Sequence, residues 1–149
     1  MNKICALVMS AVLVVCFAGF SMAANTKAEA EAMVKKGIAF IKENGKEKAL
    51  AEFSNPNGQF VKGELYIFVV DSKGMTLAHG ANAKLIGKSM IDLKDATGKL
   101  FMQEIVKVGK QGSGWVEYQW TNPVSKKIEP KIAYVQAAGD LMLACGIYK

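Results

Sequence analysis

The sequence contains no arginine, because every one of its 19 basic residues is lysine. Proteins that recognise nucleic acid rely heavily on arginine to contact base edges and the minor groove. The lysines are also scattered along the chain instead of gathered in one segment. We therefore interpret the net charge of +6 as solvated surface, and we expect no nucleic-acid partner.

Histidine is almost as scarce, since His79 is the only one in 149 residues. One histidine cannot supply the set of ligands that a zinc site needs. The chain has no G-x-S-x-G motif, and the segment after Gly112-Ser113-Gly114 has the pattern of a strand instead of the helix that a nucleophile elbow requires. The haem-attachment motif C-x-x-C-H is missing as well. We expect a binding protein and not an enzyme, with no metal and no cofactor.

Two of the three cysteines, Cys5 and Cys16, lie in an N-terminal segment with the pattern of a secretory signal. Residues 1–23 begin with one positive charge, continue with an apolar run of about 17 residues and end in small residues. Cleavage after Ala23 fits this pattern best, and cleavage after Ala24 is the near alternative. A retained membrane anchor remains the competing interpretation. The expected product is a periplasmic domain, residues 24–149.

The third cysteine, Cys145, stands in the apolar run 141–145. Without residues 1–23 it would be the only cysteine in the chain, so no intrachain disulfide is expected. We predict a buried, unreactive thiol.

The remaining sequence changes its hydrophobic period three times. Thr26 and Glu29 form a capping box that predicts the start of a helix, and Gly45 predicts its end. Apolar runs bounded by turn residues predict strands. The expected elements are a helix over 26–44 with a further turn or two through Phe53, strands over 65–70 and 75–79, a loop over 80–94, a helix from about 100 to either 109 or 112, and strands over 115–120, 128–138 and 141–148.

This order predicts the α+β class, with a long N-terminal helix packed on a five-stranded antiparallel sheet. We expect the helix to cover one face of the sheet. The other face would then be available for a ligand.

The segment GSGWVEYQW, residues 112–120, holds both tryptophans of the chain. Side chains alternate between the two faces along a strand. Tyr118 and Trp120 therefore share a face, and Trp115 lies on the opposite one. We predict that the first two help to form a pocket wall and that Trp115 mostly packs in the core.

Lys131 interrupts an otherwise apolar strand pattern, KIAYV. An inward-facing lysine is tolerated only if an anion compensates its charge. Two partners fit the sequence: a carboxylate of the protein, such as that of Glu117, or the carboxylate of a small ligand. His79 ends a strand just before a loop, where it could serve either as a structural hydrogen-bond partner or as a ligand contact.

An ordered set of motifs in this chain resembles the single Cache domain, a small extracytoplasmic sensor module related to PAS domains. The motifs run in sequence along most of the chain. They are YIFVVD (66–71) with Gly74, LAH (77–79), GKS (87–89), DLKD (92–95) with GK (98–99), GSGWVEYQW (112–120) with NP (122–123), Lys131 with YV (134–135), and GIY (146–148).

The resemblance implies a pocket for a small organic acid such as acetate, propionate, lactate or pyruvate. It also implies a membrane signalling partner, either a receptor or a histidine kinase, because such domains usually stand between two membrane segments and no second one follows here. A domain that binds no metabolite and acts only through protein contacts is the alternative. The pocket residues that the resemblance selects are Tyr66, Phe68, His79, Tyr118, Trp120 and Lys131.

Overall fold

The computed structural model describes residues 25–149. The predicted signal segment, 1–23, lies outside them. No helix within the described range is long and apolar enough to cross a membrane. In chain order the elements are α1 (Lys27–Asn44), α2 (Lys46–Phe53), β1 (Val61–Lys62), β2 (Leu65–Asp71), β3 (Thr76–His79), the 3₁₀ turn η1 (Ala83–Leu85), α3 (Phe101–Lys110), β4 (Ser113–Thr121), β5 (Ile128–Ala138) and β6 (Leu141–Tyr148).

The strands form one antiparallel sheet in the order β1-β2-β6-β5-β4, with β3 paired to β2. The hairpins β4-β5 and β5-β6 join neighbours along the chain. The long-range pairing of β2 with β6 joins the strands β1 to β3 to the strands β4 to β6 in one sheet. It places Phe68 opposite Ala144. The α+β class and the helix-on-sheet arrangement predicted from the sequence are confirmed.

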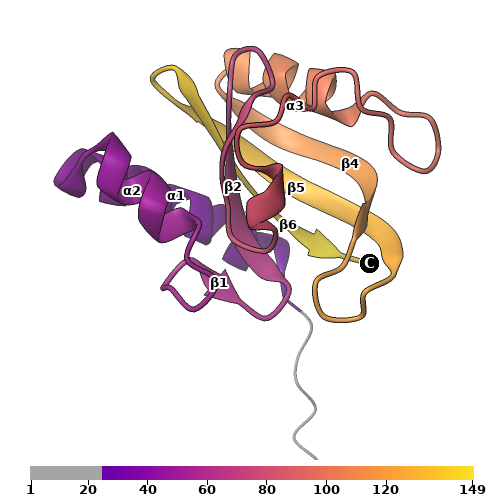
Figure 1. The fold of residues 1–149 in the computed structure, drawn as a ribbon, viewed down its shortest axis with the longest axis horizontal. Coiled ribbons are helices and arrows are strands. Elements are labelled where there is room, and N and C mark those ends of the chain that lie inside the picture. The colour runs from indigo at the N-terminus through magenta and orange to yellow at the C-terminus, as the bar shows by residue number, and fades with distance from the viewer. Residues whose placement is uncertain (1–24) are drawn as a thin grey trace, which may run out of the picture.

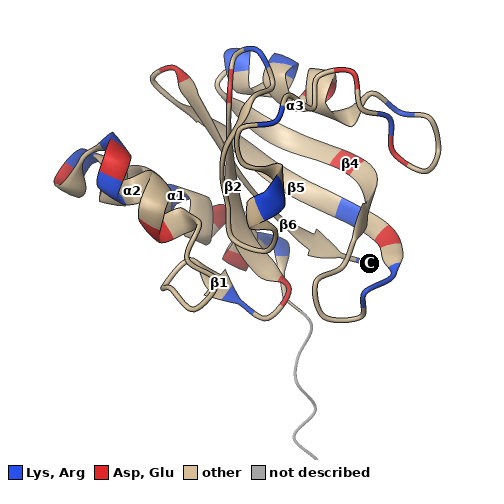
Figure 2. Cartoon of the chain, viewed as in Figure 1, with Lys and Arg blue, Asp and Glu red and all other residues tan. Residues whose placement is uncertain are grey.

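Helices lie on both faces of this sheet (Figure 1). On one face α1 and α2 cover a core that includes Phe53, Ile67 and Leu143. On the other face α3 covers a second core that includes Phe68, Phe101 and Tyr118. Charged residues lie mainly on the helices and loops, and the strands carry few of them (Figure 2).

Two details differ from the sequence prediction. The sheet has six strands and not five, because the two-residue strand β1 adds to the edge of β2. The face expected to be open is covered by α3 and by the segment between β3 and α3. A pocket on that face must therefore lie between the sheet and its cover.

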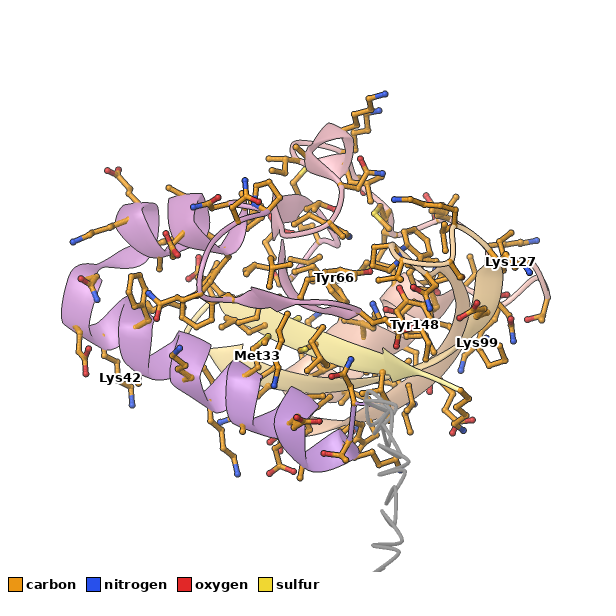
Figure 3. All side chains as sticks on the ribbon, turned by 90° about the horizontal axis from the view of Figure 1, so that it is seen from below. Met33, Lys42, Tyr66, Lys99, Lys127 and Tyr148 are labelled. Carbon is orange, nitrogen blue, oxygen red and sulfur yellow. The ribbon has the colours of Figure 1, made fainter. Side chains whose placement is uncertain are left out.

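Helix α1 packs very closely on the sheet. A Cβ atom on Gly37 would lie 2.7 Å from Cδ1 of Ile67 on β2, so glycine at this position permits the short helix-to-sheet distance. Figure 3 shows Met33 between α1 and the sheet, while Lys42 points away from it. Sγ of Cys145 lies 3.7 Å from Sδ of Met33 in this interface. Burial raises the pKa of that thiol to about 12, which agrees with an unreactive cysteine.

The capping box at the start of α1 is present as predicted. The Thr26 hydroxyl accepts a hydrogen bond from the Glu29 backbone N–H, and the Glu29 carboxylate accepts one from the Thr26 N–H. We expect Thr26→Ala to lower the free energy of unfolding by about 1 kcal/mol, the usual effect of removing an N-cap. Thr26→Ser should retain most of the stability, since its hydroxyl can accept the same bond. Urea denaturation of the three proteins tests this expectation, and an alanine variant as stable as the parent would contradict it.

Candidate functional site

The site is built around Lys131, which lies on β5 opposite Tyr118 of β4 and Tyr148 of β6. Strand alternation turns its side chain toward the α3 side of the sheet, and only 1% of the residue is exposed. Its Nζ donates a 2.8 Å hydrogen bond to the hydroxyl of Tyr66. A lysine ammonium carries three N–H donors, so this single bond leaves two without an acceptor among residues 25–149.

Aromatic rings surround the ammonium. Its Nζ lies 4.2 Å from the ring centroid of Tyr66, 5.1 Å from that of Tyr148, 5.4 Å from that of Phe68 and 5.9 Å from that of Tyr118. The negative faces of aromatic rings attract a cation and offset part of the cost of burying it. They cannot accept strong hydrogen bonds in the way that a carboxylate does.

Glu117 is not the partner of Lys131. Its side chain lies on the opposite side of β4, where Oε1 is 2.6 Å from Nζ of Lys149. The intramolecular pairing that the sequence left open is therefore wrong for this residue. Among the described residues no carboxylate forms an ion pair with Lys131.

The neighbouring strand makes room for the lysine chain. A Cβ atom on Gly146 of β6 would lie 2.6 Å from Cε of Lys131 and 2.7 Å from the carbonyl oxygen of Ile132. Any larger residue at position 146 would displace the lysine side chain or the backbone of β5. Gly146 thus helps to fix where the ammonium sits.

His79, at the end of β3, faces the same region and is uncharged. Its Nδ1 accepts hydrogen bonds from the backbone N–H groups of Ala81, at 3.2 Å, and Asn82, at 2.9 Å. Burial, and then the positive charge of Lys131, lowers the pKa of His79 to about 3. The ring therefore carries its one proton on Nε2 and presents an N–H donor.

A cavity lies beside these groups, between the sheet and α3. Its volume is about 10 Å³, which is enough for roughly one water molecule. Five of the six predicted pocket residues line it, and four others complete the wall. The predicted five are Tyr66, Phe68, His79, Tyr118 and Trp120, and the further four are Thr76, Met90, Phe101 and Met102.

Lys131 is the predicted residue that does not line the cavity itself. Its ammonium lies behind the wall, against the rings of Tyr66, Phe68 and Tyr118. The structure thus brings all six predicted residues into one neighbourhood.

The two tryptophans lie on opposite faces of β4, as alternation predicts. Trp120 packs against Phe101, with ring centroids 5.3 Å apart, on the cavity side. Trp115 packs against Tyr134 at 5.3 Å and lies among the residues of the α1 side. Only Trp120 belongs to the candidate site.

A directed chain of hydrogen bonds leads from Lys131 to the end of the sheet. Because the Tyr148 hydroxyl uses its one proton for the carbonyl of Thr121, it accepts from the hydroxyl of Tyr66 at 3.2 Å. Tyr148 in turn donates to the carbonyl of Thr121 at 2.9 Å. Figure 3 labels Tyr66 and Tyr148 in this region. This series of hydrogen bonds holds Tyr66 in place and connects β6 to the end of β4.

A helix-covered antiparallel sheet with a small aromatic cavity on one face is the arrangement found in PAS-like domains. Within this class, the chain belongs to the Single Cache domain 2 family, whose sequence model matches residues 20–148. Cache domains are extracytoplasmic sensor modules, and the family is one of ligand binding without catalysis.

The chain is similar to sensor domains of chemotaxis proteins. A methyl-accepting chemotaxis protein from Vibrio parahaemolyticus has a crystal structure that superposes with a TM-score of 0.71 at 28% identity, over 82% of this chain and 87% of that one. A periplasmic sensor domain of a chemotaxis protein gives 0.63 at 26% identity, over 79% and 86%. A Cache chemosensory domain studied for carboxylic acid recognition gives 0.64 at 24% identity, over 79% and 84%, a level that indicates shared fold alone.

A curated relative is also a methyl-accepting chemotaxis protein. The methyl-accepting chemotaxis protein CtpM of Pseudomonas aeruginosa is 34% identical over 70 residues, which is 46% of this chain and 12% of CtpM. The match therefore spans a small part of a much longer protein.

Proposed function

We propose that this domain is a periplasmic sensor module that binds a small organic acid resembling acetate, propionate, lactate or pyruvate, and that acts with a membrane signalling partner. One observation carries the proposal: a buried lysine with no carboxylate partner among the described residues stands beside an aromatic cavity. A carboxylate in that cavity would compensate the charge and accept the free N–H donors.

Two neutral donors stand near the ammonium. The Nε2–H of His79 is available because Nδ1 is already occupied. The hydroxyl of Tyr118 stays protonated, since burial raises its pKa well above the usual value. Apart from Thr76, the other walls are apolar or aromatic, including Phe68, Phe101 and Met102. Such a set of donors in an apolar shell suits a compact anion with a short carbon chain.

The ligand would have to widen the cavity, because a volume of about 10 Å³ is smaller than acetate needs. Met90 and Met102 form part of the wall. Methionine side chains change rotamer readily and adapt to irregular shapes. Their movement offers a route to a larger site without a change of fold.

A hydrolytic role for His79 does not fit its surroundings. A general base works best with a pKa near the operating pH. Burial and Lys131 hold the pKa of His79 at about 3, and its Nδ1 is engaged by two backbone N–H groups. We therefore propose binding and not catalysis.

The small cavity also favours a second candidate. If its own side chains fill the site permanently, the domain would act only through protein contacts with a receptor or kinase. The membrane partner in both candidates is suggested by relatives that are methyl-accepting chemotaxis proteins. Whether the domain binds a short carboxylate distinguishes the two candidate functions.

A thermal-shift screen with short carboxylates tests the proposal. At one hundred times its dissociation constant, a ligand that binds only the folded state adds about 2.7 kcal/mol of stability. For a domain of this size that corresponds to a rise in Tm of roughly 8 °C or more. We expect such a rise with at least one of acetate, propionate, lactate and pyruvate, and none with ethylamine as a cationic control. If all four acids leave Tm unchanged at millimolar concentration, the protein-contact function is favoured instead.

A further inference from the structure

A second hollow lies against the outside of the candidate cavity. This outer groove has a volume of about 250 Å³, compared with about 10 Å³ for the cavity. Its own residues come from the segment after β3 and from the β4-β5 hairpin. They are Ala81, Asn82, Thr121, Pro123 and Lys126.

Three residues line both compartments: Tyr66, His79 and Trp120. These side chains form the wall between the cavity and the groove. They are therefore the candidates for what keeps a cavity occupant from extending into the groove.

Two of the three are fixed by hydrogen bonds. The Tyr66 hydroxyl accepts from Lys131 and donates to Tyr148. The His79 ring is held by two backbone N–H groups. Trp120 makes no side-chain hydrogen bond within residues 25–149 and is only half-buried. Its indole packs against the rings of Phe101, with centroids 5.3 Å apart, and Tyr118, with centroids 6.3 Å apart.

We propose that Trp120 is the partition between the two compartments and sets the maximum chain length of the acid. This inference rests on the proposed function, since it assumes that the carboxylate is held at Lys131. The indole ends the cavity, so that only an acid with a short carbon chain fits inside. Without it, the cavity and the groove become one space, and the tail of a five- or six-carbon acid extends past Ala81 and Pro123.

Calorimetry with straight-chain acids tests the inference. We compare acetate, propionate, pentanoate and hexanoate on the parent protein, Trp120→Ala and Trp120→Phe. The parent should bind the two short acids and discriminate against the long ones. In Trp120→Ala the affinity for hexanoate relative to acetate should rise at least tenfold, with Trp120→Phe between the two. Trp115→Phe, which alters the tryptophan on the opposite face of β4, should keep the parent's preference.

An unchanged chain-length preference in Trp120→Ala overturns the partition, as does a parent protein that binds hexanoate as tightly as acetate. If no protein in the series binds any acid, the proposed function is wrong. Propan-1-ol and hexan-1-ol, which match propionate and hexanoate in carbon number but lack the carboxylate, then decide the partition alone. Stabilisation of Trp120→Ala by hexan-1-ol, with none for the parent, supports it, and equal responses of the two proteins overturn it.

Discussion

Lys131→Met is expected to weaken the binding of a short carboxylate by about tenfold to a hundredfold. A hydrogen bond between charged groups contributes about 1.5–3 kcal/mol, and each 1.4 kcal/mol is a factor of ten in affinity. Methionine has a similar length and fills the same space beside Gly146 and Tyr118. The loss should therefore come from the missing charge and not from a cavity.

The same substitution should leave the ligand-free protein equally stable or make it more stable. A buried ammonium without a carboxylate partner is costly, even with aromatic rings around it. Its removal costs one hydrogen bond to Tyr66, which keeps its bond to Tyr148. We expect the free energy of unfolding to stay constant or to rise by on the order of 1–3 kcal/mol. A substitution that lowers ligand affinity without lowering folding stability identifies a residue that is retained for binding.

Isothermal titration calorimetry and urea denaturation measure the two effects. Lys42→Met is the matched control, because Lys42 points away from the sheet on α1 and the net charge changes equally (Figure 3). It should alter neither affinity nor stability appreciably. Unchanged affinity in Lys131→Met would show that the lysine does not hold the ligand. Strong destabilisation would show instead that its role is structural.

Local sequence signals predicted much of the fold. The capping box at Thr26 located the start of α1, and the apolar run beginning at Leu65 located β2. Alternation along β4 separated Trp115 from Trp120. Each of these signals depends on residues within one element, where periodicity and capping chemistry act.

The long-range parts of the structure had no comparable signal. The sheet order depends on the pairing of β2 with β6, two strands about 75 residues apart along the chain, and no local pattern specifies such a contact. β1 is only two residues long, too short for an alternating pattern. The contact between Lys131 and Tyr66 requires that pairing and the β5-β6 register together.

The same distinction between local and long-range signals applies to the residues of the candidate site. Tyr66, Phe68, Tyr118 and Lys131 belong to strands, so their shared face follows from the two-residue period once the pairing is known. Met90 comes from a loop, and no periodicity predicts which way a loop residue points. Phe101 and Met102 begin α3, which covers a face that was expected to be open.

His79 should make the stability of the ligand-free protein fall steeply in mild acid. Its pKa is about 3 in the folded protein, where burial and Lys131 disfavour the charged ring, and near its ordinary value of 6.5 in the unfolded chain. Below pH 6.5 the unfolded state therefore binds one more proton than the folded state, and protons favour unfolding. The contribution of the neutral His79 ring to the free energy of unfolding is therefore complete above pH 6.5 and is lost as the pH falls toward 3. The expected slope approaches about 1.4 kcal/mol per pH unit.

The comparison of the parent with His79→Asn isolates this contribution. Asparagine does not titrate, and its Oδ1 can accept the backbone N–H bonds of Ala81 and Asn82 that Nδ1 accepts in the parent. Carboxylates with lowered pKa, such as Glu29 and Glu117, also lose stabilising contacts in acid, but they do so equally in both proteins. In urea denaturation between pH 7.5 and 4.5, the stability difference should shift by roughly 2–3 kcal/mol in favour of the variant. Parallel curves would mean that His79 accepts a proton as readily in the folded protein as in the unfolded chain, and its ring would then be no fixed neutral donor.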